Sequence, residues 1–241
     1  MSSNAQSPVS TQIWRNQVSL HWPVDHATLR AMVPVAFEIA DFEGTSWVSL
    51  SAFEVAGIEV SSPIPLPSID PFAQVELSTR VRAGSREGTW YLAIDGSSNT
   101  AAAAASRLFS LPYQRADVGI ASDDRETPTI AVTAKREGRS PAALQLAVRA
   151  AGSMIDPHPG TIEHYLLDSS GVFIMREGAP QHVGLTREPW RWSRAEVVKL
   201  EETWLWAAGI TARPQRPLAF LVREIRPAIY APQPLDSAAV S

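Results

Sequence analysis

The sequence predicts an α+β domain built mainly from antiparallel strands, and three observations support this. Stretches with partial apolar and polar alternation recur between turn-forming residues, as in 74–82, 90–95 and 142–150. Helical signals are few and are separated by strands. The chain has 241 residues, of which 45% are hydrophobic, so it can bury a sizeable core. We expect a single domain over residues 12–230, with disordered tails at 1–11 and 231–241.

Composition narrows the classes of function. The formal net charge of −4 offers no basic field for nucleic acid, so we expect no nucleic-acid partner. Cysteine is absent, which excludes disulfides and a cysteine nucleophile and suits a reducing compartment. The polar N-terminus has no signal-peptide pattern, and no apolar run has the roughly 18 residues of a membrane span. We therefore expect a cytoplasmic protein without a membrane partner, and homo-oligomerisation stays open.

The N-terminal third contains a strand, a short helix, a hairpin and a loop. Residues 13–20 form a plausible strand, and Asp25 can cap a helix over 26–33 that Pro34 closes. Residues 37–55 have the pattern of a hairpin. Residues 61–71 carry four prolines and cannot be regular structure. This segment is either a binding lid or a plain surface crossing.

Residues 74–82 form the most informative strand. Val75, Leu77, Thr79 and Val81 share one face, while the other face is polar. An ordinary half-buried strand turns its polar face to solvent, and composition favours this arrangement. Facing inward, the same residues would line a site with an acid, a hydroxyl and a cation. The polar face consists of Gln74, Glu76, Ser78, Arg80 and Arg82.

Residues 89–118 predict a strand, a loop, a helix and a second strand. The alanine run at 101–105 is the strongest helix former in the chain, and Pro112 ends it. Tyr113 then lies at the start of the next strand, where its side chain is held firmly. The residues alone slightly favour a core position for Tyr113 over a functional one.

The C-terminal half predicts strands at 117–123, 128–136, 142–150, 162–167, 171–176, 181–188 and 218–230. A capping box opening at Ser193 predicts a helix that runs to Ala208. His182 is a candidate acid–base group, although a structural role is favoured. Lys135 and Lys199, the only lysines, are expected to be solvated, which makes them poor nucleophiles. The chain lacks the nucleotide-binding, zinc-protease and serine-hydrolase motifs, and we expect neither a metal nor a cofactor.

Several short motifs carry a resemblance to a known family. They are HWPV at 21–24, VP at 33–34, GTWYLAID at 88–95, AASRLFSLPY at 104–113, PW at 189–190 and AEV at 195–197. In this order and spacing the chain resembles the YqjF-like family of unknown function, within the acetoacetate-decarboxylase-like superfamily. The resemblance implies an antiparallel β-cone or barrel, closed or nearly so, with peripheral helices. It also implies that the polar face of 74–82 lines the interior.

The resemblance also shows where this chain departs from the decarboxylases. Tyr113 and Gln114 stand where those enzymes have two lysines, the first of which forms the Schiff base. Gln74 stands at the place of their pocket glutamate. Tyrosine cannot form an imine, and glutamine cannot exchange a proton as a carboxylate does. We therefore do not expect imine-forming decarboxylation.

Three hypotheses of function follow. The first is a small-molecule-binding protein for a carboxylated or carbonyl compound, in which Arg80 and Arg107 bind oxygens because guanidinium pairs with carboxylate. The second is a lysine-independent enzyme for enolisation, cyclisation or dehydration, with Glu76 as base and Tyr113 as acid. The third is a protein-interaction module that uses the loop 61–71. Further candidate ligand contacts are Gln74, Ser78, Gln114, His182 and an apolar wall from Trp90 or Trp47.

Overall fold

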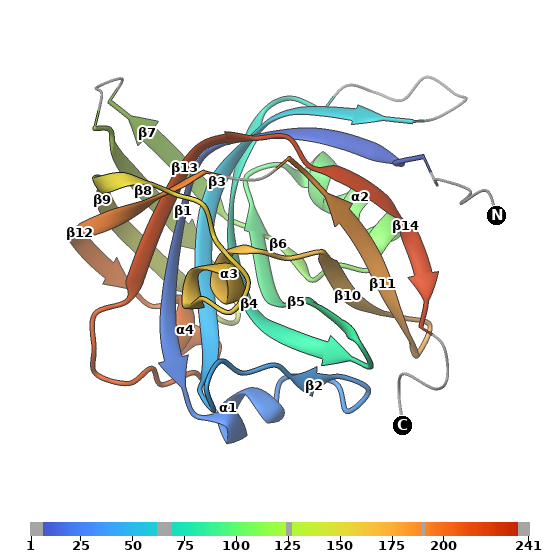
Figure 1. Ribbon diagram of the computed structural model, residues 1–241. Coiled ribbons are helices and arrows are strands. Elements are labelled where there is room, and N and C mark those ends of the chain that lie inside the picture. Colours follow the sequence, from blue (N-terminus) through green and yellow to red (C-terminus); the bar gives the residue numbers. More distant parts are fainter. Residues whose placement is uncertain (1–6, 62–68, 124–126, 189–190, 236–241) are drawn as a thin grey trace.

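The computed structural model describes residues 7–61, 69–123, 127–188 and 191–235, which are mostly strand (Figure 1). The strands are β1 (Ser10–Val24), β2 (Glu38–Ile39), β3 (Ser46–Val60), β4 (Phe72–Ala83), β5 (Arg86–Gly96), β6 (Tyr113–Arg115), β7 (Asp117–Ser122), β8 (Thr129–Arg136), β9 (Ala142–Ile155), β10 (Gly171–Arg176), β11 (Ala179–Thr186), β12 (Trp192–Glu202), β13 (Leu218–Ile225) and β14 (Ala228–Pro234). The helices are α1 (His26–Arg30), α2 (Asn99–Phe109), α3 (Ile162–Leu167) and α4 (Trp204–Ala207).

All of these strands join one sheet, and seven of them form a ring. The order is β14-β11-β10-β5-β4-β3-β1-β13-β12-β9-β8-β7, and β14 also pairs with β1. The ring is uneven, because β5 and β10 meet through one residue pair and β14 and β1 through two. The β5–β10 and β5–β6 pairings are parallel. The expectation of an antiparallel, closed or nearly closed β-cone is therefore confirmed only in part.

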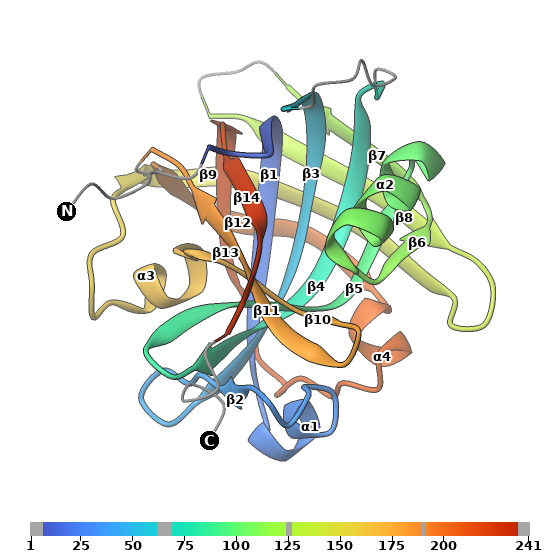
Figure 2. The same cartoon turned by 90° about the vertical axis from the view of Figure 1, so that its right-hand side faces the viewer.

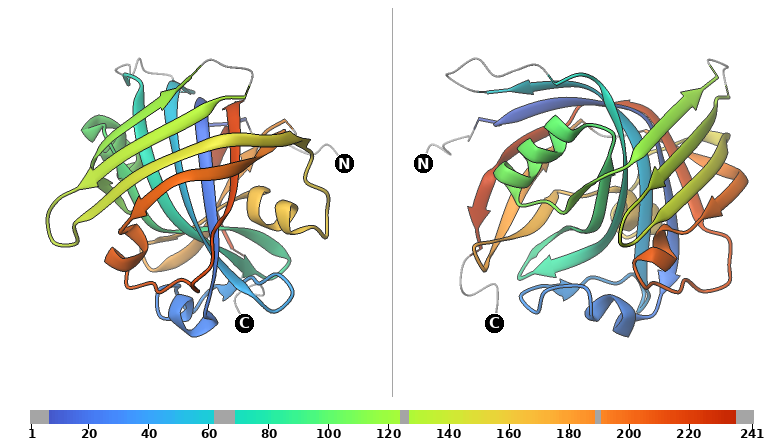
Figure 3. Two further views of the ribbon diagram at one scale, coloured as in Figure 1. Left: turned by 90° about the vertical axis from the view of Figure 1, so that its left-hand side faces the viewer. Right: turned by 180° about the vertical axis from the view of Figure 1, so that it is seen from behind.

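The strands β7, β8, β9 and β12 form an outer layer that crosses β1, β3 and β4 (Figure 3, left). Many apolar residues of these three strands alternate with polar ones and belong to one buried cluster with apolar residues of β8 and β9. This cluster covers one face of β1, β3 and β4, so their other face is turned to the interior of the ring. The cluster includes Val18, Leu20, Val48, Leu50, Val75, Leu77, Ile130, Val132, Leu144, Leu146 and Val148.

A buried ion pair ties the ring to the outer layer. Asp95 of β5 is fully buried and accepts hydrogen bonds from the Arg136 guanidinium of β8 at 3.0 and 3.2 Å. The Trp204 indole N–H of α4 donates to the same carboxylate at 2.8 Å. The carboxylate thus has three donated bonds, as a buried charge requires.

Two helices lie on either side of β10, β11 and β14 (Figure 2). The predicted α2 is present: Ser98 caps it by accepting from the Ala101 N–H, and Ser110 ends it in the left-handed conformation. The expected strand at 162–167 is wrong, because this segment is α3. Thr161 caps α3, and Tyr165 donates a hydrogen bond to the Ala40 carbonyl at 2.9 Å.

The structure also bears on the expected C-terminal helix, the expected tails and the proline-rich loop. The helix expected from Ser193 is wrong, because β12 occupies most of it and only α4 is helical. The expected disordered tails at 1–11 and 231–241 are partly wrong, because β1 begins at Ser10 and β14 extends to Pro234. Residues 62–68, most of the proline-rich loop, lie outside the described residues. No helix in the described ranges has the length and apolar character needed to span a membrane.

Candidate functional site

The polar face of β4 is turned to the interior of the ring. Gln74, Glu76 and Arg80 expose only 3, 8 and 8% of their surface. Composition favoured exposure of these side chains to solvent. In the fold, the outer layer covers the apolar face of β4 and the other ring strands enclose its polar face, so both faces are buried. The fold therefore places an acid, an amide and a cation in a buried position, where each needs a partner.

Strand register extends this polar face over three strands. His21 of β1 is aligned with Ser49 of β3, which is aligned with Ser78 of β4. One row along, Ser19 is aligned with Ser51, and Ser51 with Glu76. Within each row a short hydrogen bond joins β1 to β3. The Ser19 and Ser51 hydroxyls are 2.8 Å apart, and His21 Nδ1 is 2.7 Å from Ser49 Oγ.

A cavity of about 90 Å³, here called the arginine cavity, lies against these rows. Three buried polar atoms of its lining residues have no hydrogen-bond partner in the described part of the chain: Gln17 Oε1, His21 Nε2 and Arg80 Nε. Each such atom costs about 1–3 kcal/mol unless something pairs with it. Three of them around one cavity mark a place where a polar molecule would be stabilised. The lining also includes Trp14, Ser19, Ser49, Ser51, Glu76, Ser78, Thr89, Tyr91, Leu167, Ser169, Val172, Leu185, Arg187 and Trp192.

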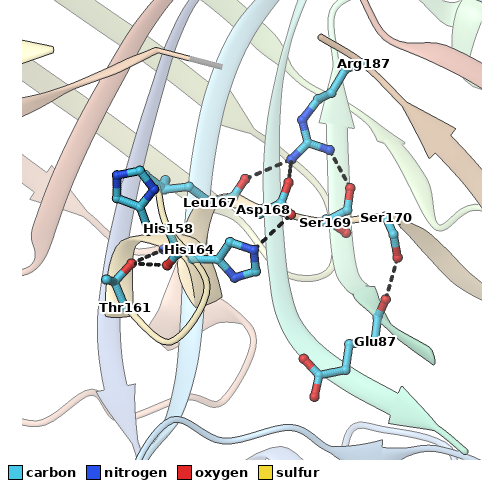
Figure 4. A network of polar contacts seen from close by, with 9 residues as sticks. All are labelled: Glu87, His158, Thr161, His164, Leu167, Asp168, Ser169, Ser170 and Arg187. Atoms are coloured by element: carbon cyan, nitrogen blue, oxygen red, sulfur yellow. Dashed lines mark hydrogen bonds and ion pairs between the residues drawn. The ribbon is translucent and has the colours of Figure 1, made fainter. Parts of the chain in front are cut away.

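Arg187, just beyond β11, brings a second guanidinium to the arginine cavity. It donates to the Asp168 carboxylate at 2.5 Å and to the backbone carbonyls of Leu167 and Ser169 (Figure 4). Burial lowers the pKa of Arg187 to about 10, Asp168 opposes this, and the positive charge of Arg80 lowers it further. Two cations that repel each other across one small space favour an anion between them.

A second cavity of about 90 Å³, here called the tyrosine cavity, adjoins the first and holds a chain of hydrogen bonds. The Tyr113 hydroxyl donates to Gln74 Oε1 at 2.8 Å, and Gln74 Nε2 donates to Glu76 Oε1 at 2.7 Å. Burial raises the pKa of Glu76 to about 8, although hydrogen bonds from Gln74 and Tyr91 partly oppose the shift. Burial also raises the pKa of Tyr113. Glu76 is therefore mostly protonated at neutral pH.

Four of the residues predicted to contact a ligand do not line either cavity. Trp90 packs against Phe37 on the other face of β5, with ring centroids 5.4 Å apart. Gln114 is exposed because it alternates with the inward Tyr113, and Arg107 lies on the exposed side of α2. His182 packs beside Phe173, with ring centroids 5.0 Å apart, and does not line either cavity, although its Nε2 lies close to Gly171, which does line the arginine cavity. Trp47, the alternative apolar wall, does not line them either.

The sequence reasoning missed several lining residues. The stretch 17–21 places Gln17, Ser19 and His21 at alternate positions between Val18 and Leu20. Small or neutral polar residues in that pattern, rather than Lys or Glu, were the available signal for a buried polar face. Burial lowers the pKa of His21 to about 3, so it is neutral at physiological pH. Other missed lining residues include Ser49, Ser51, Tyr91 and Arg187.

Comparison with known proteins gives the family. The model of DUF2071, described as an uncharacterized conserved protein, matches residues 11–226. The uncharacterized protein YqjF of Bacillus subtilis (strain 168) is 24% identical over 210 residues, 87% of this chain and 86% of YqjF. This confirms the resemblance drawn from the motifs.

Solved structures give the fold. An acetoacetate decarboxylase-like enzyme from Sphingomonas wittichii RW1 has a TM-score of 0.65 at 13% identity, covering 96% of this chain and 94% of that one. The enduracididine biosynthesis enzyme MppR complexed with pyruvate has a TM-score of 0.65 at 11% identity, covering 98% and 94%. The chain thus has an acetoacetate-decarboxylase-like fold and belongs to the DUF2071 family of uncharacterized conserved proteins.

Proposed function

We propose that this protein binds a small carboxylated or carbonyl compound, with its oxygens held by Arg80 in the arginine cavity. The observation that carries the proposal is the convergence of three unpartnered buried polar atoms, on Gln17, His21 and Arg80, around one cavity. A carboxylate accepts from the Arg80 guanidinium, and Gln17 Oε1 accepts a hydrogen bond from a hydroxyl or a protonated group of the ligand.

The charges of the lining support an anionic ligand. Arg80 and Arg187 are both cationic, while Glu76, mostly protonated at neutral pH, does not repel a carboxylate. The cavity volume of about 90 Å³ corresponds to roughly three waters, which suits a polar group of a few heavy atoms. Pyruvate has this size and carries both a carboxylate and a carbonyl group. MppR, a protein of the same fold, has been solved in complex with pyruvate, which supports a ligand of this size and chemistry.

The positions of the lysines support binding without a Schiff base. Lys135 and Lys199 lie on β8 and β12 of the outer layer, where their side chains expose 68 and 48% of their surface. Each faces a carboxylate, Glu137 at 2.9 Å and Glu201 at 3.4 Å respectively. Neither lysine lines the arginine or the tyrosine cavity.

The test is a thermal-shift screen with small keto acids, hydroxy acids and aromatic carboxylates, followed by calorimetric titration of the strongest binder. A ligand that binds only the folded state raises the melting midpoint. Arg80→Gln should weaken binding about 10- to 100-fold, since a charged hydrogen bond contributes about 1.5–3 kcal/mol. Arg82→Gln is the matched control, because Arg82 lies on the same strand but pairs with Glu87 outside the cavity. Equal losses in both variants, or no binder at all, would overturn the proposal.

A second candidate function is acid–base catalysis on the bound carbonyl compound, favoured by the raised pKa of Glu76. Below about pH 8, protonated Glu76 donates to a carbonyl oxygen, and above it the carboxylate acts as a base toward a neighbouring C–H. Tyr113 holds Gln74, and Gln74 holds Glu76, in the required orientation.

This candidate is tested by deuterium exchange at C3 of pyruvate, followed by proton NMR. The protein-dependent exchange rate should rise with pH through about 8 and disappear in Glu76→Gln. Binding without protein-dependent exchange would leave a binding protein and remove the catalytic role.

A further inference from the structure

An apolar groove lies beside α2, outside the two cavities. Its volume is about 530 Å³. One face of α2 lines it, with Ala101, Ala104, Ala105 and Leu108 at the i, i+3, i+4 and i+7 positions. The alanines leave the space open because they carry so little side chain. Apolar residues of β3 and β4 form the facing wall, and this space is here called the α2 groove. That wall includes Val55, Ile58, Val60 and Phe72.

The α2 groove opens at the surface. Leu108 exposes 53% and Val60 39% of its surface, and both line the groove. Large apolar side chains are normally exposed singly, so two of them on one groove mark a surface that an apolar group can cover.

The groove adjoins the tyrosine cavity, which in turn adjoins the arginine cavity. Gln12, Ala105, Phe109 and Tyr113 line both the groove and the tyrosine cavity. The tyrosine cavity and the arginine cavity in turn share five lining residues: Trp14, Glu76, Tyr91, Val172 and Leu185. The three spaces thus form a series whose linings change from two guanidiniums, through an amide and a carboxyl group, to a mainly apolar groove that also includes Arg176.

We infer that the ligand is an amphipathic carboxylate, whose head occupies the arginine cavity and whose apolar tail runs past Tyr113 into the α2 groove. This inference rests on the proposed function and names its ligand class. The arginine cavity accommodates only a few heavy atoms, so a longer ligand must continue through the tyrosine cavity. A straight-chain acyl group fits the lining there, because Ala105 and Phe109 offer apolar contacts without further charges.

The experiment is calorimetric titration with butanoate, hexanoate, octanoate and decanoate at concentrations below micelle formation. In the wild-type protein, affinity should rise about fourfold for each added methylene that becomes buried. Ala105→Leu puts a larger side chain at the junction of the groove and the tyrosine cavity, and should remove this dependence on chain length. Ala103→Leu is the matched control, because Ala103 is on the same helix, is exposed and does not line the groove. Arg80→Gln should weaken all four ligands by a similar factor.

The outcomes separate the inference from the proposed function. Binding that depends on Arg80 but not on chain length would overturn the inference and leave the proposed function standing. Binding that grows with chain length and is unaffected by Arg80→Gln and Ala105→Leu would place the acyl chain elsewhere and overturn the inference. The absence of binding by any carboxylate, pyruvate included, would overturn both.

Discussion

Removing the carboxyl group of Glu76 should change how stability depends on pH. Its pKa rises from 4.5 to about 8 on folding. The folded state therefore binds this proton more tightly than the unfolded state, and the resulting stabilisation is complete below pH 4.5 and is lost as pH rises to about 8. Between pH 5 and pH 8 the loss amounts to roughly 3–4 kcal/mol, using 1.36 kcal/mol per pKa unit. For a domain of this size, that corresponds to roughly 10 °C in the melting temperature.

The assay is urea denaturation of the wild type and of Glu76→Gln at several pH values. Glutamine keeps the size and an acceptor for Gln74 but has no proton to lose. The unfolding free energy of the variant minus that of the wild type should rise by roughly 3–4 kcal/mol from pH 5 to pH 8. Glu38→Gln, a change at an exposed carboxylate of β2, is the control. A difference for Glu76→Gln that stays constant with pH would refute the reasoning.

Three further predictions concern the scaffold. Asp95→Asn should cost about 3–5 kcal/mol in urea denaturation, because it leaves the buried Arg136 charge unpaired; a cost below 1 kcal/mol would contradict this. In NMR titration, His21 should show no protonation between pH 8 and pH 5, since burial lowers its pKa to about 3; a midpoint near 6.5 would contradict this. Gly171→Ala should destabilise the fold, because a Cβ there would come within 2.4 Å of the Val183 carbonyl oxygen, and an unchanged melting temperature would argue against that close packing.

Much of the strand pattern could be predicted from the sequence, since alternation is a local property. The strand 74–82 was predicted with the correct two faces, but composition turned the polar face toward solvent. Its true direction depends on the outer layer, whose residues join the same buried cluster as Val75 and Leu77 from more than forty positions away. Arg187 was missed for the same reason, since the carbonyls that accept its hydrogen bonds belong to Leu167 at the end of α3 and to Ser169 in the loop that follows.

One error had a signal in the sequence. Neighbouring strand residues point to opposite faces, so Tyr113 and Gln114, both predicted to contact a ligand, could not both face the interior. Applying that rule would have removed one residue of this pair.

The helix expected from Ser193 failed for a different reason. Its capping box and apolar spacing were locally sound, but residues 192–202 pair with β9 along their length, and this long-range pairing outweighs the local preference. Such a competition is decided by tertiary contacts, which a single segment does not reveal.

The most direct test of the central claim is a crystal structure of the protein grown with pyruvate. The account predicts pyruvate in the arginine cavity, with its carboxylate oxygens within about 2.7–3.1 Å of the Arg80 guanidinium nitrogens. An arginine cavity that holds only water while pyruvate binds elsewhere, or not at all, would contradict the claim that these buried polar groups form a carboxylate site.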